Sequence, residues 1–191
     1  RLSGYYYNKE MFEQVGQDEP PKTFDEFFDL CEKLKSAGIT PVGMMTGENG
    51  WTMHFWYEAL MAAHSEKGLQ YAMNPQTTDF TSEPFRWASK QIKLIITEYA
   101  NSDALGASYE MVASQMFAGD IAMIGNGPWM AASYRNPNKT EPGFEEKIGY
   151  APMPGNFVYG FADTMGHGAM TAPNGEEKQL GAMLFWGTEL Q

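Results

Sequence analysis

Short apolar segments alternate with amphipathic helical segments along this chain, and the alternation limits the folds that it can adopt. The strand-like segments are predicted at 5–7, 39–45, 121–125, 148–151 and 166–171. The segments with helical spacing of apolar residues lie at 8–16, 23–37, 51–61, 81–100 and 108–117, with further helices after 126 and from 174. Strands separated by helices rather than by tight turns favour an α/β fold, with helices packed around a small mixed sheet.

The predicted helix over 23–37 has the clearest start signal. Thr23 and Glu26 match a capping box, in which the Thr23 hydroxyl accepts a bond from a free amide and Glu26 returns one. An apolar stripe follows at helical spacing: Phe24, Phe27, Leu30, Cys31 and Leu34. We therefore expect Cys31 to be a buried core thiol, because a single cysteine forms no internal disulfide.

Charge and motif content exclude several classes of function. The chain carries 13 basic and 24 acidic residues, a net charge of −11, which disfavours nucleic-acid binding. The three histidines show no metal-ligand spacing, and no phosphate-binding or dinucleotide-binding motif is present, so we expect no metal and no cofactor. No catalytic residue is predicted. Glu48 and Asp163 as an acid–base pair for glycoside hydrolysis remain an unspecific alternative among so many carboxylates.

Aromatic residues are more numerous than a core of this size needs, with 5 Trp, 10 Tyr and 12 Phe. Trp129 lies in the first turn of a predicted helix that follows the strand at 121–125. Ligands of α/β folds bind at the carboxyl ends of strands, and an indole offers a flat apolar face that suits a pyranose ring. Core packing is the alternative for Trp129, and it is the preferred interpretation for Trp51 and Trp56, which lie at helical spacing.

Three blocks of sequence resemble the family 1 extracellular solute-binding proteins of bacterial ABC sugar importers, the branch that includes maltodextrin-binding protein. The first runs from Tyr6 to Phe12 and continues at 20–27, with Pro20-Pro21-Lys22-Thr23-Phe24. The second runs from Phe117 to Met123 and continues to Asn126-Gly127-Pro128-Trp129. The third is Gly149-Tyr150-Ala151-Pro152-Met153-Pro154. They follow the order found in the family and cover most of the chain.

The resemblance implies one lobe of a two-lobed receptor with the periplasmic-binding-protein-like (type II) fold. We expect residues 1–150 to form the second, C-terminal lobe and residues 151–191 to cross back toward a first lobe. Both ends of the chain are expected to be internal to a longer polypeptide, because neither a leader at the start nor a helix stop at the end is found. The Pro/Gly-rich segment 152–160 is the predicted hinge.

The resemblance also implies a carbohydrate ligand captured by closure of the two lobes, and delivery to the membrane subunits of an ABC permease. Trp129 resembles the family's sugar-stacking tryptophan, supported by Asn126 and Gly127. Glu48, Asn49 and Trp51 lie where the family places a carboxylate and aromatic rings against sugar hydroxyls, and Asp163 and His167 would reach the ligand from the other side. The expected location is extracellular or periplasmic, with a lipoprotein anchor outside this chain.

Two further expectations follow. A lobe that lacks its partner leaves apolar residues after Pro154 uncovered, so that segment is expected to fold back, to be disordered, or to self-associate with a second copy. A binding lobe for a polyamine or a peptide is the alternative to a sugar receptor, because a strongly acidic chain attracts organic cations.

Overall fold

The computed structural model describes residues 4–73 and 79–155, apart from the side chain of Asn49. The strands are β1 (Gly4–Asn8), β2 (Thr40–Gly43), β3 (Ile121–Asn126) and β4 (Ile148–Pro152). The α-helices are α1 (Lys9–Gln14), α2 (Phe24–Ser36), α3 (Met53–His64), α4 (Glu66–Met73), α5 (Glu83–Leu94) and α6 (Tyr109–Ala118). The 3-10 helices are η1 (Glu48–Gly50), η4 (Pro128–Arg135) and η5 (Phe144–Lys147). The element η3 (Ile95–Tyr99) is a π-helical turn.

The four strands form one mixed sheet in the order β2-β3-β1-β4. β1 is antiparallel to both β3 and β4, whereas β2 and β3 are parallel. Gly4 at the start of β1 pairs with Asn126 at the end of β3 and with Pro152 at the end of β4. The described chain therefore enters and leaves the sheet at the edge where β3 ends.

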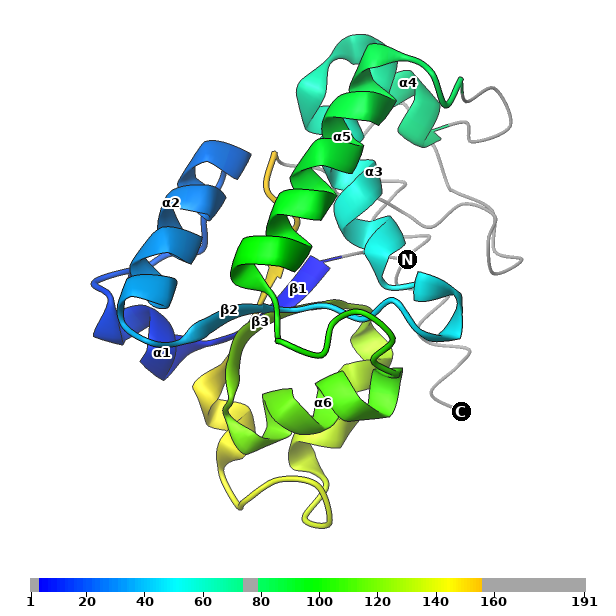
Figure 1. Cartoon of the computed structure of the whole chain (residues 1–191). Coiled ribbons are helices and arrows are strands. Elements are labelled where there is room, and N and C mark those ends of the chain that lie inside the picture. The colour runs from blue at the N-terminus through cyan, green and yellow to red at the C-terminus, as the bar shows by residue number, and fades with distance from the viewer. Residues whose placement is uncertain (1–3, 74–78, 156–191) are drawn as a thin grey trace, which may run out of the picture.

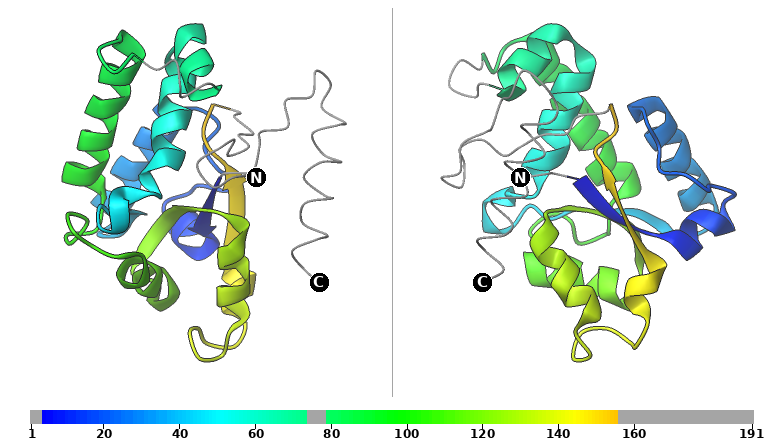
Figure 2. Two further views of the ribbon diagram at one scale, coloured as in Figure 1. Left: turned by 90° about the vertical axis from the view of Figure 1, so that its right-hand side faces the viewer. Right: turned by 180° about the vertical axis from the view of Figure 1, so that it is seen from behind.

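Helices cover both faces of the sheet (Figure 1). On one face α2, α3 and α5 enclose a core that includes Phe27, Leu60 and Ile95. On the other face α6 and η4 enclose a second core around Met116 and Ile124. The side and rear views show the same three layers (Figure 2). The predicted α/β class with helices around a small mixed sheet is confirmed.

Side-chain caps fix several helix starts. Asn8 accepts a hydrogen bond from the Met11 amide, and Thr23 accepts one from the Glu26 amide at 3.2 Å. Glu26 returns a bond, as expected for a capping box, but the amide that its carboxylate accepts, at 2.6 Å, is that of Lys22 and not that of the cap residue Thr23. The extended backbone of Thr23 places the amide of the preceding residue within reach of that carboxylate. Cys31 is buried, as expected.

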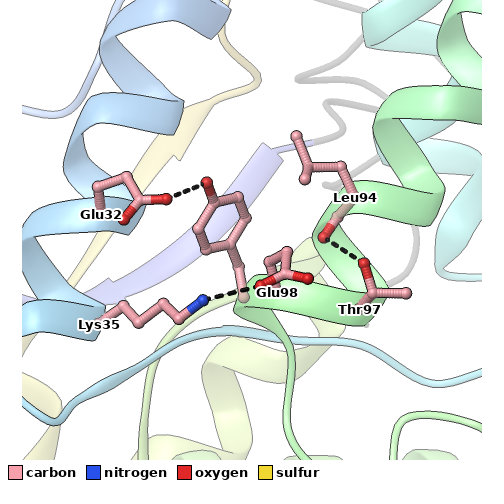
Figure 3. Close-up of polar contacts among 6 residues, drawn as sticks. Glu32, Lys35, Leu94, Thr97 and Glu98 are labelled. Carbon is pink, nitrogen blue, oxygen red and sulfur yellow. Dashed lines mark hydrogen bonds and ion pairs between the residues drawn. The ribbon is translucent and has the colours of Figure 1, made fainter.

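The helix predicted over 81–100 changes geometry before its end. α5 runs to Leu94, and Ile95–Tyr99 continues as a π-helical turn. Figure 3 shows the polar contacts that join this turn to α2: Lys35 pairs with Glu98 at 3.0 Å, and the Tyr99 hydroxyl donates to Glu32 at 2.5 Å. Tyr99 is buried on the same side as Ile92 and Ile95, as the apolar spacing predicts, so the wider turn continues the inner face of α5.

Two further differences separate the structure from the prediction. The segment after Asn126, predicted as a helix, is a 3-10 helix. The helix α4, which directly follows α3, was not predicted from the spacing of apolar residues. The strand predicted at 166–171 and the helix predicted from Asn174 lie outside the described residues.

Candidate functional site

Four aromatic side chains meet at the edge of the sheet where β3 ends. The ring centroid of Trp129 lies 5.9 Å from that of Trp51 and 6.4 Å from that of Phe55, and Trp51 lies 5.7 Å from Tyr109. We call Trp51, Phe55, Tyr109 and Trp129 the aromatic shelf. Within the shelf Phe55 is buried, Trp51 and Tyr109 are half-buried, and Trp129 is 38% exposed. The shelf therefore presents ring surface to solvent, which core packing does not require.

The turn between β3 and η4 holds Trp129 in place. A Cβ at Gly127 would overlap the six-membered ring of Trp129, so the indole lies directly against this backbone. Asn126 is fully buried; its side-chain oxygen accepts the Gly127 amide at 2.8 Å and its amide group contacts the Met130 sulfur at 3.1 Å. The Tyr6 hydroxyl donates to the Gly127 carbonyl at 3.3 Å. Asn126 and Gly127 thus support the indole from below.

Tyr109 and Phe55 are shelf residues that sequence reasoning missed. Tyr109 is the first residue of α6, and α6 leads into β3, so the start of the helix lies at the edge where β3 ends. An aromatic residue at the start of a helix that precedes a buried strand was the signal available for Tyr109. Phe55 lies one helical turn after Trp51, a spacing that indicated only a shared face.

The phenols near the turn remain protonated at neutral pH. Burial raises the pKa of Tyr6 to about 12. Burial also raises the pKa of Tyr109, although the hydrogen bond with the Asn126 side chain acts in the opposite direction. Each hydroxyl can therefore act as a hydrogen-bond donor as well as an acceptor.

Glu48 and Asn49 belong to η1, which leads directly into Trp51. Glu48 is exposed and has a φ of 51°, a left-handed conformation that is uncommon outside glycine. The loop is held to the segment before α6, since the Gly47 amide donates to the Ala107 carbonyl at 3.0 Å. The side chain of Asn49 lies outside the described part of the structure.

The remaining residues of interest divide into two groups. Trp56, expected in the core, is 1% exposed and stacks against Tyr5 at 5.8 Å. Asp163 and His167 lie outside the described residues, so their placement remains a prediction.

Within residues 4–73 and 79–155, no three acidic, histidine or cysteine side chains are grouped as a metal site would require. None of the helices in these ranges has the length and apolarity needed to cross a bilayer.

Comparison with known proteins identifies the family. The family model described as bacterial extracellular solute-binding protein matches residues 3–182. The chain belongs to this family. The multiple sugar-binding protein of Streptococcus mutans is 29% identical to it over 162 residues, which is 81% of this chain and 36% of that protein.

Solved structures of solute-binding proteins have a similar fold. A chitin oligosaccharide binding protein matches with a TM-score of 0.70 and 26% identity, covering 83% of this chain and 39% of that one. A solute-binding protein in complex with raffinose matches with a TM-score of 0.62 and 28% identity, covering 81% and 40%. This chain thus spans less than half the length of the relatives that it matches.

Proposed function

We propose that this chain is the second lobe of a two-lobed carbohydrate receptor that serves an ABC importer. The observation that carries the proposal is the exposed aromatic shelf at the sheet edge where β3 ends. The relatives named above for sugar binding, raffinose and chitin oligosaccharide support a sugar as the ligand. Residues 1–150 would form this lobe, and residues 151–191 would cross toward the first lobe.

The chemistry of the shelf fits a pyranose ring. Indole and phenol faces pack against the C–H face of a sugar, and their polar edges can hydrogen-bond with its hydroxyls. The Glu48 carboxylate, which precedes Trp51 in η1, would accept two sugar hydroxyl protons in a charge-assisted contact. Asn126 and Gly127 would position Trp129, while Asn49, Asp163 and His167 are proposed as further contacts.

Binding would work by closure of the two lobes. Gly4 pairs with Pro152, so the two connections to a first lobe would run side by side next to the shelf. A sugar that contacts both lobes favours the closed state by the difference in its affinity for the closed and open forms. One lobe alone supplies only part of these contacts, so it should bind weakly.

The same proposal covers location and partners. A receptor of this family would work outside the cell or in the periplasm, held by a lipoprotein anchor and docking to the permease subunits. It would be a binding protein rather than an enzyme, and an assay for released reducing sugar tests the glycoside hydrolase alternative. Self-association through residues after Pro154 remains a prediction, which light scattering of the 191-residue chain tests.

Calorimetric titration with maltose, raffinose, xylo-oligosaccharides and chitin oligosaccharides tests the ligand class. The 191-residue chain should bind in the millimolar range or weaker. In a two-lobed form of the protein, Trp129→Ala should weaken binding by ~1–3 kcal/mol, the scale of burying one large side chain. Trp87→Ala is the matched control, because Trp87 is half-buried on α5 against His64, outside the shelf.

Two outcomes would contradict this function. Micromolar sugar binding by the 191-residue chain would show that one lobe is sufficient. Equal sugar affinity of the Trp129→Ala and Trp87→Ala variants would show that the shelf does not contact the ligand. A polyamine receptor would instead show tight spermidine binding that depends on Glu48 and Asp163.

A further inference from the structure

A pocket of about 360 Å³ lies between α3, α4 and α5, next to η1. α3 contributes Phe55 to the shelf, whereas its residues Met53, Tyr57 and Glu58 line this pocket. The volume lies within the range of small-molecule sites. Gly50 also lines it, so the pocket begins beside the loop that leads to Trp51. Nothing in the proposed sugar contacts uses this space.

Aromatic rings form much of the pocket wall, and several of these rings are held in place by contacts with one another. Tyr57, Tyr71, Phe80 and Phe85 all line it. The Tyr57 and Phe85 centroids lie 4.8 Å apart, and Phe80 meets Phe85 edge to face at 4.8 Å. The Tyr57 hydroxyl donates to the Phe85 carbonyl at 2.9 Å, which fixes the ring of Tyr57. The wall is therefore arranged before any ligand binds.

A single carboxylate, that of Glu58, lines this largely apolar pocket. Burial raises its pKa from 4.5 to about 7, and burial is the cause found for this shift. Among the described residues no lysine or arginine forms an ion pair with it. Half-burying an acidic group without a cation costs free energy, because the charged form loses water and gains no partner.

We propose that this pocket binds a small monovalent organic cation, with the positive group between the Glu58 carboxylate and the aromatic wall. Faces of aromatic rings attract cations, and quaternary or alkylated ammonium groups fit such rings because their methyl groups are also apolar. The Lys67 ammonium already lies 5.4 Å from the centroid of Tyr71, so the rings of Tyr57, Phe80 and Phe85 are the ones that would meet the ligand. The Glu58 carboxylate, which has no ion pair with a lysine or arginine among the described residues, favours a cation over a neutral apolar molecule.

The site is independent of the proposed sugar site. Its ligand is recognised by charge and ring faces, whereas the shelf offers rings to a neutral sugar. Variants of Trp129 should consequently leave the pocket unchanged, and variants of Glu58 should leave sugar binding unchanged. Failure of one proposal is thus distinguishable from failure of the other.

The test is calorimetric titration of the 191-residue chain at pH 8 with choline and with 3,3-dimethylbutan-1-ol, its uncharged counterpart of the same shape. Choline should bind saturably, and the alcohol at least about tenfold more weakly. Glu58→Gln should weaken choline binding about tenfold and abolish the preference for the charged probe. Glu83→Gln is the matched control: it makes the same change in net charge at an exposed position in the first turn of α5.

A second variant tests the aromatic wall without depending on Glu58. Phe80 is 69% exposed, so Phe80→Ala should fold normally and weaken choline binding several-fold. The proposal is overturned if choline does not bind saturably, or if the two probes bind equally well. It is also overturned if Glu58→Gln binds choline as tightly as Glu83→Gln.

Discussion

Two tryptophans of this chain lie against glycines that are two residues apart, yet their environments are opposite. The Trp56 indole lies against Gly125 and is 1% exposed, while the Trp129 indole lies against Gly127 and is 38% exposed. In both cases the absence of a Cβ lets an indole approach the backbone closely. The same local feature thus serves core packing at one position and a surface shelf at the other.

Neighbouring elements decide which outcome results. Trp56 lies at the end of the first turn of α3, where Tyr5 of β1 and Phe27 of α2 contact it with centroids at 5.8 and 5.1 Å. Trp129 lies in the first turn of η4, beyond the last residue of β3, where the sheet ends. The comparison suggests that Trp56 contributes to stability and Trp129 to ligand binding, and three sets of variants test this division.

The largest effect is expected for Trp56→Ala. Truncating a fully buried indole leaves a cavity and should lower the free energy of unfolding by about 3–5 kcal/mol. Trp129→Ala removes a ring that is already partly in water, so its cost should be below about 1 kcal/mol. Urea unfolding of the two variants, followed by far-UV circular dichroism, measures the difference. Similar losses of stability would show that the shelf is part of the core.

Smaller effects are expected from adding one methyl group beneath each indole. A Cβ at Gly125 would overlap the Trp56 ring nitrogen, and the packed core allows little movement, so Gly125→Ala should cost about 1–3 kcal/mol. At Gly127 the solvent-exposed indole of Trp129 can turn away, so the cost should be below about 1 kcal/mol.

In the Gly127→Ala variant, the Trp129 indole that has turned away from the new methyl group should no longer stack on a sugar. Gly127→Ala should therefore weaken sugar binding by a two-lobed form of the protein, although it hardly changes the urea midpoint. Unchanged sugar affinity together with a large loss of stability would reverse the roles of the two glycines.

The sequence predicted the elements better than it predicted the site. Caps and apolar spacing located α2, α5 and α6, because these signals arise within one turn of helix. The place of Trp129 at the end of β3 also followed from sequence order. Tyr109 was missed because its place at the start of α6 indicated only the edge of the sheet, while its contact with Trp51 joins segments 58 positions apart.

The pocket between α3, α4 and α5 was missed for a related reason. α4 was not predicted, so its residues Tyr71 and Ala72 could not be placed beside Tyr57 of α3. The π-helical turn at Ile95–Tyr99 was also missed, since its residues have ordinary helical propensities. Features that depend on how distant segments meet were thus harder to predict than the segments themselves.

The last, comparably small effect concerns the backbone of η1, which leads into the shelf residue Trp51. Glu48 has a φ of 51°, which costs a residue with a side chain about 1–2 kcal/mol, whereas glycine adopts it freely at some cost in unfolded-state entropy. Glu48→Gly should therefore be more stable than Glu48→Ala by about 1 kcal/mol. Both variants remove the carboxylate, so both should weaken sugar binding by a two-lobed form of the protein to the same extent. Equal stability of the two variants in urea would show that η1 relaxes without cost and that the left-handed conformation of Glu48 is not strained.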